Sequence, residues 1–90
     1  MQKVPGINRG KVVLYALSTC IWCKKTRELL DKMKVEYSYI YMDELDNEVE
    51  AKFKEELEKW NPKCSFPTVV INNKECIVGF DEAAIKQELE

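Results

Sequence analysis

Two cysteines separated by two residues are the side chains of this sequence best suited to chemistry. Cys20 and Cys23 stand in the tetrapeptide Cys-Ile-Trp-Cys, directly after a short apolar segment and two hydroxyl residues. On the first turn of a helix, this spacing brings two sulfur atoms close enough to form a disulfide. The positive end of the helix dipole and its free N–H groups favour the thiolate of the first cysteine. The pair is therefore predicted to perform thiol–disulfide exchange through a mixed disulfide, with Cys20 as nucleophile and Cys23 as the more buried, resolving thiol.

The chain contains no histidine, and this absence narrows the possible mechanisms. It excludes a Cys–His nucleophile pair, a histidine metal ligand and an imidazole pH switch. A zinc site would need two more ligands, and the remaining cysteines, Cys64 and Cys76, do not repeat the close spacing of the first pair. We interpret these two as ordinary small residues and predict no metal ligands. Thiolate formation then depends on the helix terminus and on the positive charge of Lys24, Lys25 and Arg27.

Length and composition indicate one small globular domain. The chain has 90 residues, 46% apolar and 33% charged, with a net charge of −2 that argues against a general nucleic-acid binder. No apolar run approaches the roughly 18 residues of a membrane helix, and no signal peptide is recognisable. The prediction is a cytoplasmic protein, where a close cysteine pair is catalytic more often than structural. We expect an irregular lead-in at 1–10 and a single domain at 11–90.

The hydrophobic pattern alternates between strands and helices. Val12 to Leu17 is a continuous apolar run typical of a strand buried on both faces. Asp81 is a candidate N-cap for the last helix, with a hydrophobic residue on either side of it at the spacing of a hydrophobic staple. The expected elements are strands at 12–17, 37–42, 68–71 and 76–78, helices at 23–34, 43–60 and from 82, and a turn at Asn72-Asn73.

This order, β-α-β-α-β-β-α, predicts an α/β fold. Its first β-α-β unit should be parallel and right-handed, and the last two strands should form a hairpin. A four-stranded mixed sheet with helices on its faces closes such a chain.

Three segments, in this order and spacing, make the chain resemble the glutaredoxin and glutaredoxin-like family of the thioredoxin fold. They are V-V-L-Y-A-L-S-T-C-I-W-C-K-K, S-F-P-T-V-V-I and V-G-F-D-E, and the resemblance covers about residues 11–90. It implies a cis proline at Phe66-Pro67 beside the dithiol, where a substrate backbone can pair. It also implies that Trp22 lies on the rim of the dithiol, and that Gly79-Phe80-Asp81 would hold the γ-glutamyl end of glutathione. Capping of the last helix uses only one carboxylate oxygen, so Asp81 could cap that helix and also contact glutathione.

The resemblance implies a monomeric dithiol oxidoreductase that acts on protein or low-molecular-weight disulfides, independently of membranes and nucleic acids. No tightly bound cofactor is expected; the reductant is glutathione, another low-molecular-weight thiol or a flavoprotein.

Departures from the family pattern leave two alternatives open. Glutathione-using members usually carry lysine three residues before the first cysteine, where this chain has Leu17. The chain is also similar to the glutaredoxin-like electron donors of ribonucleotide reductase, which take electrons from a thioredoxin reductase. Ile21 replaces the usual proline after Cys20, and some glutaredoxins without that proline bridge a [2Fe–2S] cluster as dimers with glutathione.

Charge is distributed unevenly along the chain. Residues 1–34 sum to +6 and residues 43–59 to −5. The basic segment surrounds the dithiol, where it could steer anionic thiols or acidic partner surfaces. The acidic segment is a candidate partner face, which gives a third hypothesis of a redox-silent adaptor.

Overall fold

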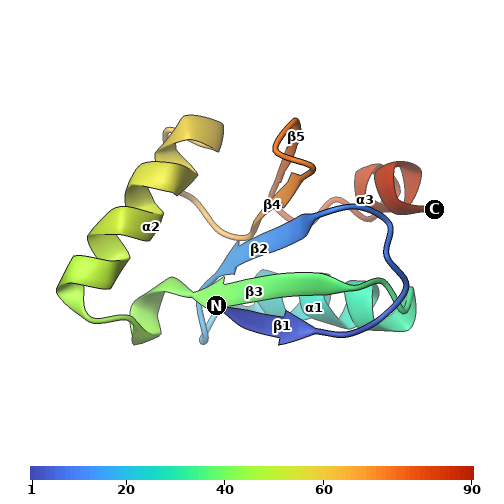
Figure 1. Cartoon of the computed structure of the whole chain (residues 1–90), viewed down its shortest axis with the longest axis horizontal. Coiled ribbons are helices and arrows are strands. Elements are labelled where there is room, and N and C mark those ends of the chain that lie inside the picture. Colours follow the sequence, from blue (N-terminus) through green and yellow to red (C-terminus); the bar gives the residue numbers. More distant parts are fainter.

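In the computed structural model, which describes all residues from Met1 to Glu90, five strands form one mixed sheet (Figure 1). The sheet has the order β1-β3-β2-β4-β5. The elements along the chain are β1 (Gln2–Val4), β2 (Val12–Ala16), α1 (Ile21–Lys32), β3 (Tyr37–Tyr41), the short 3₁₀ helix η1 (Met42–Glu44), α2 (Asn47–Trp60), β4 (Thr68–Ile71), β5 (Glu75–Val78) and α3 (Glu82–Leu89). No helix is long and apolar enough to cross a lipid bilayer.

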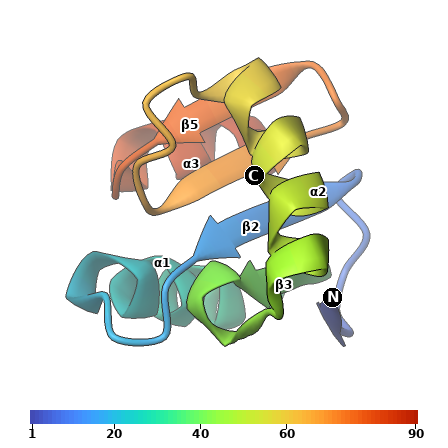
Figure 2. The same ribbon diagram turned by 90° about the vertical axis from the view of Figure 1, so that its left-hand side faces the viewer.

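The central strand β2 organises the sheet. It pairs in parallel with β3 and antiparallel with β4, and β4 and β5 form the expected hairpin. The parallel β2-α1-β3 unit is thus confirmed. All five residues of β2 are buried because helices cover both faces of the sheet. Figure 2 shows α2 in front of the sheet, with α1 and α3 behind it.

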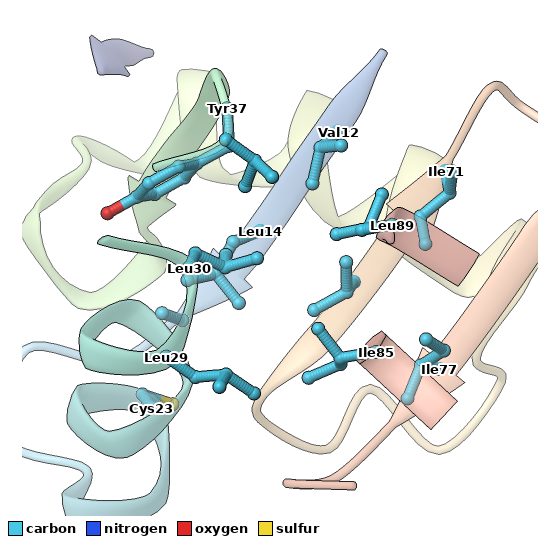
Figure 3. Packing of buried hydrophobic residues seen from close by; sticks show 13 residues of the cluster. Val12, Leu14, Cys23, Leu29, Leu30, Tyr37, Ile71, Ile77, Ile85 and Leu89 are labelled. Carbon is cyan, nitrogen blue, oxygen red and sulfur yellow. The ribbon is translucent and has the colours of Figure 1, made fainter. Parts of the chain in front are cut away.

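The face covered by α1 and α3 holds the larger core. Thirteen buried residues form it, and Cys23 is one of them, on the same side of α1 as Leu29 and Leu30 (Figure 3). The resolving cysteine predicted from the sequence is therefore part of a core to which α3 also contributes, through Ile85 and Leu89. The cluster comprises Val12, Leu14, Ala16, Cys23, Leu29, Leu30, Val35, Tyr37, Val69, Ile71, Ile77, Ile85 and Leu89.

The face covered by α2 holds a smaller core of six buried residues. Leu57 is the only α2 residue that is buried, and no part of it is exposed. Phe53 and Trp60 pack against this cluster from partly buried positions, whereas Val49 is 37% exposed. The attachment of α2 to the sheet therefore depends largely on one leucine.

An arginine and three tyrosines fix α1 against β3. The Arg27 guanidinium donates to the hydroxyls of Tyr37 and Tyr41 at 3.2 and 2.9 Å, and lies 3.8 Å from the ring centre of Tyr39. Tyr37 in turn donates to Asp31 at 2.7 Å, through a hydroxyl that points away from the core (Figure 3). These contacts set the position of the helix that carries the dithiol.

The sheet has five strands where four were predicted, and the predicted lead-in at 1–10 is irregular only in part. Residues 2–4 form β1, which pairs antiparallel with β3. These residues thus belong to the same sheet as the rest, and Ile7 is tied to Val35 by an isolated bridge. A strand of three residues is too short to show an alternating pattern, and its pairing is set by β3, far away in the sequence.

A continuous helix over 43–60 is also wrong. Met42, buried in the smaller core, begins the 3₁₀ turn η1, and the backbone is then extended at Leu45 and Asp46 before α2 begins at Asn47. Leu45 packs against the same core from its extended position. Burial of these two apolar side chains therefore accompanies the break in the helix.

Two other local predictions are confirmed. Asn72 and Asn73 both have positive φ, which the tight β4–β5 turn requires. The side-chain oxygen of Asn72 also accepts the backbone N–H of Lys11 at 2.8 Å, which ties the turn to the start of β2. Asp81 caps α3, since its carboxylate accepts the N–H of Ala84 at 3.0 Å.

Candidate active site

Cys20 is the N-cap of α1. Its backbone is extended, and its carbonyl accepts the first helical hydrogen bond, from the N–H of Lys24 at 3.1 Å. Its Sγ accepts the N–H of Cys23 at 3.2 Å, so the sulfur itself serves as the capping group. A sulfur in this position lies at the positive end of the helix dipole, among N–H groups that have no helical partner. Cys20 is partly exposed, as a nucleophile must be.

Cys23 lies beneath Cys20 and is only 1% exposed. Burial, a side-chain hydrogen bond to Cys20 and the charges of Cys20 and Asp43 raise the pKa of Cys23 to about 12. At neutral pH this sulfur is therefore a thiol. When Cys20 is joined to a substrate it carries no charge, so its own contribution to the raised pKa disappears. Cys23 thus stays protonated and unreactive until Cys20 has formed a mixed disulfide.

A carboxylate that the sequence analysis did not identify holds the loop before Cys20. Asp43, in η1, accepts hydrogen bonds from both the backbone N–H and the hydroxyl of Ser18, the former at 2.9 Å. These bonds lower the pKa of Asp43, so it is charged at neutral pH. Twenty-two residues lie between Cys20 and Asp43 in the sequence, and no local motif marks Asp43.

The loop before β4 is fixed by a network of hydrogen bonds. The Phe66–Pro67 peptide bond is cis, and the Pro67 carbonyl accepts the N–H of Gly79 at 2.8 Å. Asn61, which is buried, donates to the hydroxyl of Thr68 at 3.1 Å. The backbone N–H and C=O of Phe66, in contrast, have no hydrogen-bond partner in the chain. The loop therefore presents one free donor and one free acceptor.

These elements enclose a pocket of about 240 Å³. Its wall is formed by Trp22 and Phe80, whose ring centres are 6.0 Å apart with their planes 23° from parallel. Trp22 is 54% exposed, in agreement with its predicted place on the rim. Cys20 packs against the larger core together with Phe66 and Phe80. Five of the eight predicted site residues line this pocket: Trp22, Phe66, Pro67, Gly79 and Phe80.

Two predicted positions have defined backbone roles beside the pocket. Gly79 has a φ of +81°, a conformation that favours glycine, and open space lies where a side chain would extend. Asp81 is placed by its cap of α3 and does not line the pocket. A ligand contact by Asp81 stays a prediction.

A second pocket of about 290 Å³ lies on the other side of Phe66. Half-buried Cys64, whose φ is +51°, lines it, together with Leu17 and Asp43. Cys76 lies elsewhere, on β5, where its thiol is 3.5 Å from the carbonyl of Trp60. Nowhere in the chain do three histidine, cysteine, aspartate or glutamate side chains come together as a metal site.

Comparison with known proteins decides the family. The model of the glutaredoxin family matches residues 12–77. This chain belongs to the glutaredoxin family. The structure of the glutaredoxin from Methanosarcina mazei Go1 is 46% identical, with a TM-score of 0.92 over 98% of this chain and 85% of that one. The methanoredoxin of Methanosarcina acetivorans is 44% identical, with a TM-score of 0.91 over 93% and 88%.

A curated relative extends the comparison to bacteria. Glutaredoxin 1 of Rickettsia prowazekii is 34% identical over 69% of this chain and 62% of its own length. The chain thus spans less than two thirds of that relative. Membership of the glutaredoxin family, together with the cysteine pair at the start of α1, supports a general assignment as a thiol oxidoreductase.

The raised pKa of Cys23 predicts a large difference in alkylation rate between Cys20 and Cys23. At about pH 8, a group with this pKa is a thiolate roughly once in ten thousand molecules. Iodoacetamide should therefore modify Cys20 first and Cys23 much more slowly, because burial, the largest cause of the raised pKa of Cys23, persists after Cys20 is alkylated. Peptide mapping by mass spectrometry measures this, with protein unfolded in concentrated guanidinium chloride as the control. Equal rates at Cys20 and Cys23 in the folded protein would contradict the prediction.

Proposed function

We propose that this chain is a dithiol thiol–disulfide oxidoreductase that reduces protein or low-molecular-weight disulfides. The observation that carries the proposal is the difference in exposure between the two sulfurs at the start of α1. Cys20 caps α1 and is partly exposed, while Cys23 lies buried directly beneath it with a pKa of about 12. One sulfur is thereby available to a substrate and the other only to its neighbour.

The reaction proceeds in two exchanges. The Cys20 thiolate attacks one sulfur of the substrate disulfide, that S–S bond breaks, and the departing thiolate takes up a proton. Cys23 then loses its proton and attacks Cys20 Sγ, which breaks the mixed disulfide and releases the second substrate thiolate, again to be protonated. The substrate gains two electrons and two protons, and the protein is left with a Cys20–Cys23 disulfide. Two electrons from an external reductant restore the dithiol.

The pocket beside the dithiol supports binding of an extended substrate segment. The free N–H and C=O of Phe66 offer a donor and an acceptor to a substrate backbone, as an added strand requires. Trp22 and Phe80 offer an apolar wall to the substrate side chains next to the reacting cysteine. Phe66, Pro67 and Gly79 complete the proposed substrate site.

The reductant is proposed to be a low-molecular-weight thiol, glutathione included, or a flavoprotein. Leu17 stands where a lysine would attract a carboxylate, and the pocket that it lines contains two acidic residues and one basic residue, Lys54. A coupled assay with glutathione, another small thiol and a thioredoxin reductase, run side by side, identifies the reductant. Action as a monomer in the cytoplasm remains a prediction from the sequence.

Replacing Cys23 by serine should trap the intermediate. The variant can still form the mixed disulfide through Cys20 but cannot resolve it, so a covalent adduct with a peptide disulfide should accumulate. Mass spectrometry of the intact protein and of its peptides locates the adduct. Cys64→Ser, which removes the thiol of the second pocket, is the matched control and should release product as the wild type does. An adduct at Cys64, or none at all, would contradict the proposal.

The iron–sulfur carrier is the alternative, and it rests on Ile21 in place of proline after Cys20. Within one chain no third ligand side chain joins the cysteine pair, so a cluster would require a second copy and a thiol from solution. Anaerobic reconstitution with iron, sulfide and glutathione, followed by absorption spectroscopy and size measurement, decides the matter. A coloured dimer favours the carrier, and a colourless monomer contradicts it.

A further inference from the structure

A groove between α1 and α3 continues from the wall of the active-site pocket. We call it the α1–α3 groove; its volume is about 500 Å³, roughly twice that of the pocket. Phe80 lines both the pocket and the groove, so the two are neighbours across one aromatic ring. The residues that line the groove are Lys25, Glu28, Leu29, Lys32, Met33, Phe80, Glu82 and Lys86.

The charge of this groove differs in sign from that of the whole chain. Three lysines and two glutamates give it a net charge of +1, whereas the chain carries −2. Lys86 is paired with Glu82 at 2.8 Å, but Lys25 and Lys32 make no ion pair. The ammonium group of Lys25 lies 5.6 Å from the ring centre of Trp22, directly beside the pocket wall. Glu28, also in the groove, makes no ion pair either, so two unpaired lysines and one unpaired glutamate leave an excess of one positive charge there.

Apolar atoms lie between these charges. Leu29 belongs to the larger core, while Met33 and Phe80 are partly buried against it. A groove with apolar residues and lysines along it suits an extended segment that has aliphatic or aromatic side chains and carboxylates.

We propose that the α1–α3 groove binds an acidic segment of the protein substrate, next to the cysteine that is being reduced. The proposal rests on the proposed function, because the pocket must hold that cysteine while the flanking residues pass over Phe80 into the groove. Charge complementarity is the argument for an acidic occupant. The protein would then select among protein disulfides by the charge of the substrate residues that flank them. Small disulfides have no such flanking residues and would not show this selectivity.

The test uses a double charge reversal far from the sulfur atoms. Lys32→Glu with Lys86→Glu removes one unpaired lysine and one lysine held in an exposed helical ion pair. Lys52→Glu with Lys59→Glu is the matched control on α2, where Lys59 has the same kind of pair, with Glu56. Both variants change the net charge by the same amount. Two substrates are compared: a peptide disulfide with glutamates on both sides of its cysteine, and hydroxyethyl disulfide, which is small and uncharged.

We expect the groove variant to lose about tenfold in kcat/KM on the acidic peptide, as two exposed charge reversals allow. Its rate on hydroxyethyl disulfide and both rates of the control should stay within about twofold of the wild type. Added salt should reduce the wild type's preference for the acidic peptide, since screening weakens exposed pairs.

Three results would overturn the proposal. One is an equal loss in the two variants, which indicates a general effect of net charge. Another is no loss in the groove variant. The third is a dimer of the wild type that the groove substitutions dissociate, which assigns the groove to a second copy of the chain. If the wild type reduces neither substrate, the proposed function itself fails; if it reduces both and the groove variant keeps its full rate on the acidic peptide, only the groove proposal fails.

Discussion

Replacing Cys20 by serine should abolish disulfide reduction, with a loss of at least about a thousandfold. A serine hydroxyl does not ionise near neutral pH and cannot form the mixed disulfide with which the reaction begins. Folding should be preserved, because serine is itself a favourable N-cap and can accept the Cys23 N–H in place of the sulfur. The variant therefore separates the chemistry from the structure.

Reduction of insulin or of a mixed-disulfide peptide measures this loss, and circular dichroism checks the fold. Cys76→Ser, on β5, is the control that removes a thiol outside the site and should keep full activity. Full activity of Cys20→Ser would contradict the proposed function. A redox titration without a two-electron transition in the wild type would instead favour the redox-silent adaptor.

Truncating Leu57 to alanine should cost about 2–5 kcal/mol of the free energy of unfolding. Leu57 is the one fully buried residue by which α2 is attached to the sheet, so its truncation leaves a cavity in the smaller core. Domains of this size have a stability of only about 5–15 kcal/mol, so the loss is a large share of the total. Urea denaturation of the variant and the wild type measures it.

Val49→Ala is the matched control on the same helix. Val49 is 37% exposed, so the same kind of truncation should cost about 1 kcal/mol or less. Equal losses for Leu57→Ala and Val49→Ala would show that the smaller core does not depend on Leu57. Hydrogen exchange adds a local readout: α2 should lose protection before the strands of the sheet do.

The region around the dithiol was predictable because its signals are local. The apolar run of β2, the C-x-x-C spacing and the amphipathic pattern of α1 lie within about twenty residues, and each is read from neighbours in the chain. The same holds for the Asp81 cap and the Asn72-Asn73 turn. The convergence of Trp22 with Phe66 and Phe80 was expected only from the family resemblance, since it joins segments far apart in the sequence.

The features that escaped prediction depend on strand pairing. In the parallel register of β2 and β3, Ala16 lies beside Tyr41. Two residues further along each strand, Ser18 therefore meets Asp43, and this contact places a carboxylate beside the dithiol loop. Nothing in the sequence defines this register by itself. The strand β1 was missed for the same reason, since β3 is its only partner.

The short strand β1 has a consequence for self-association. Edge-to-edge growth of a sheet into a fibre needs two edges that can each accept a new strand. At one edge of this sheet, β1 has three residues, carries Lys3 and is followed by Pro5, all features that discourage further pairing. Only the edge at β5 is then open to a new strand. Pairing of sheet edges between molecules should therefore give at most a dimer, joined through the two β5 strands.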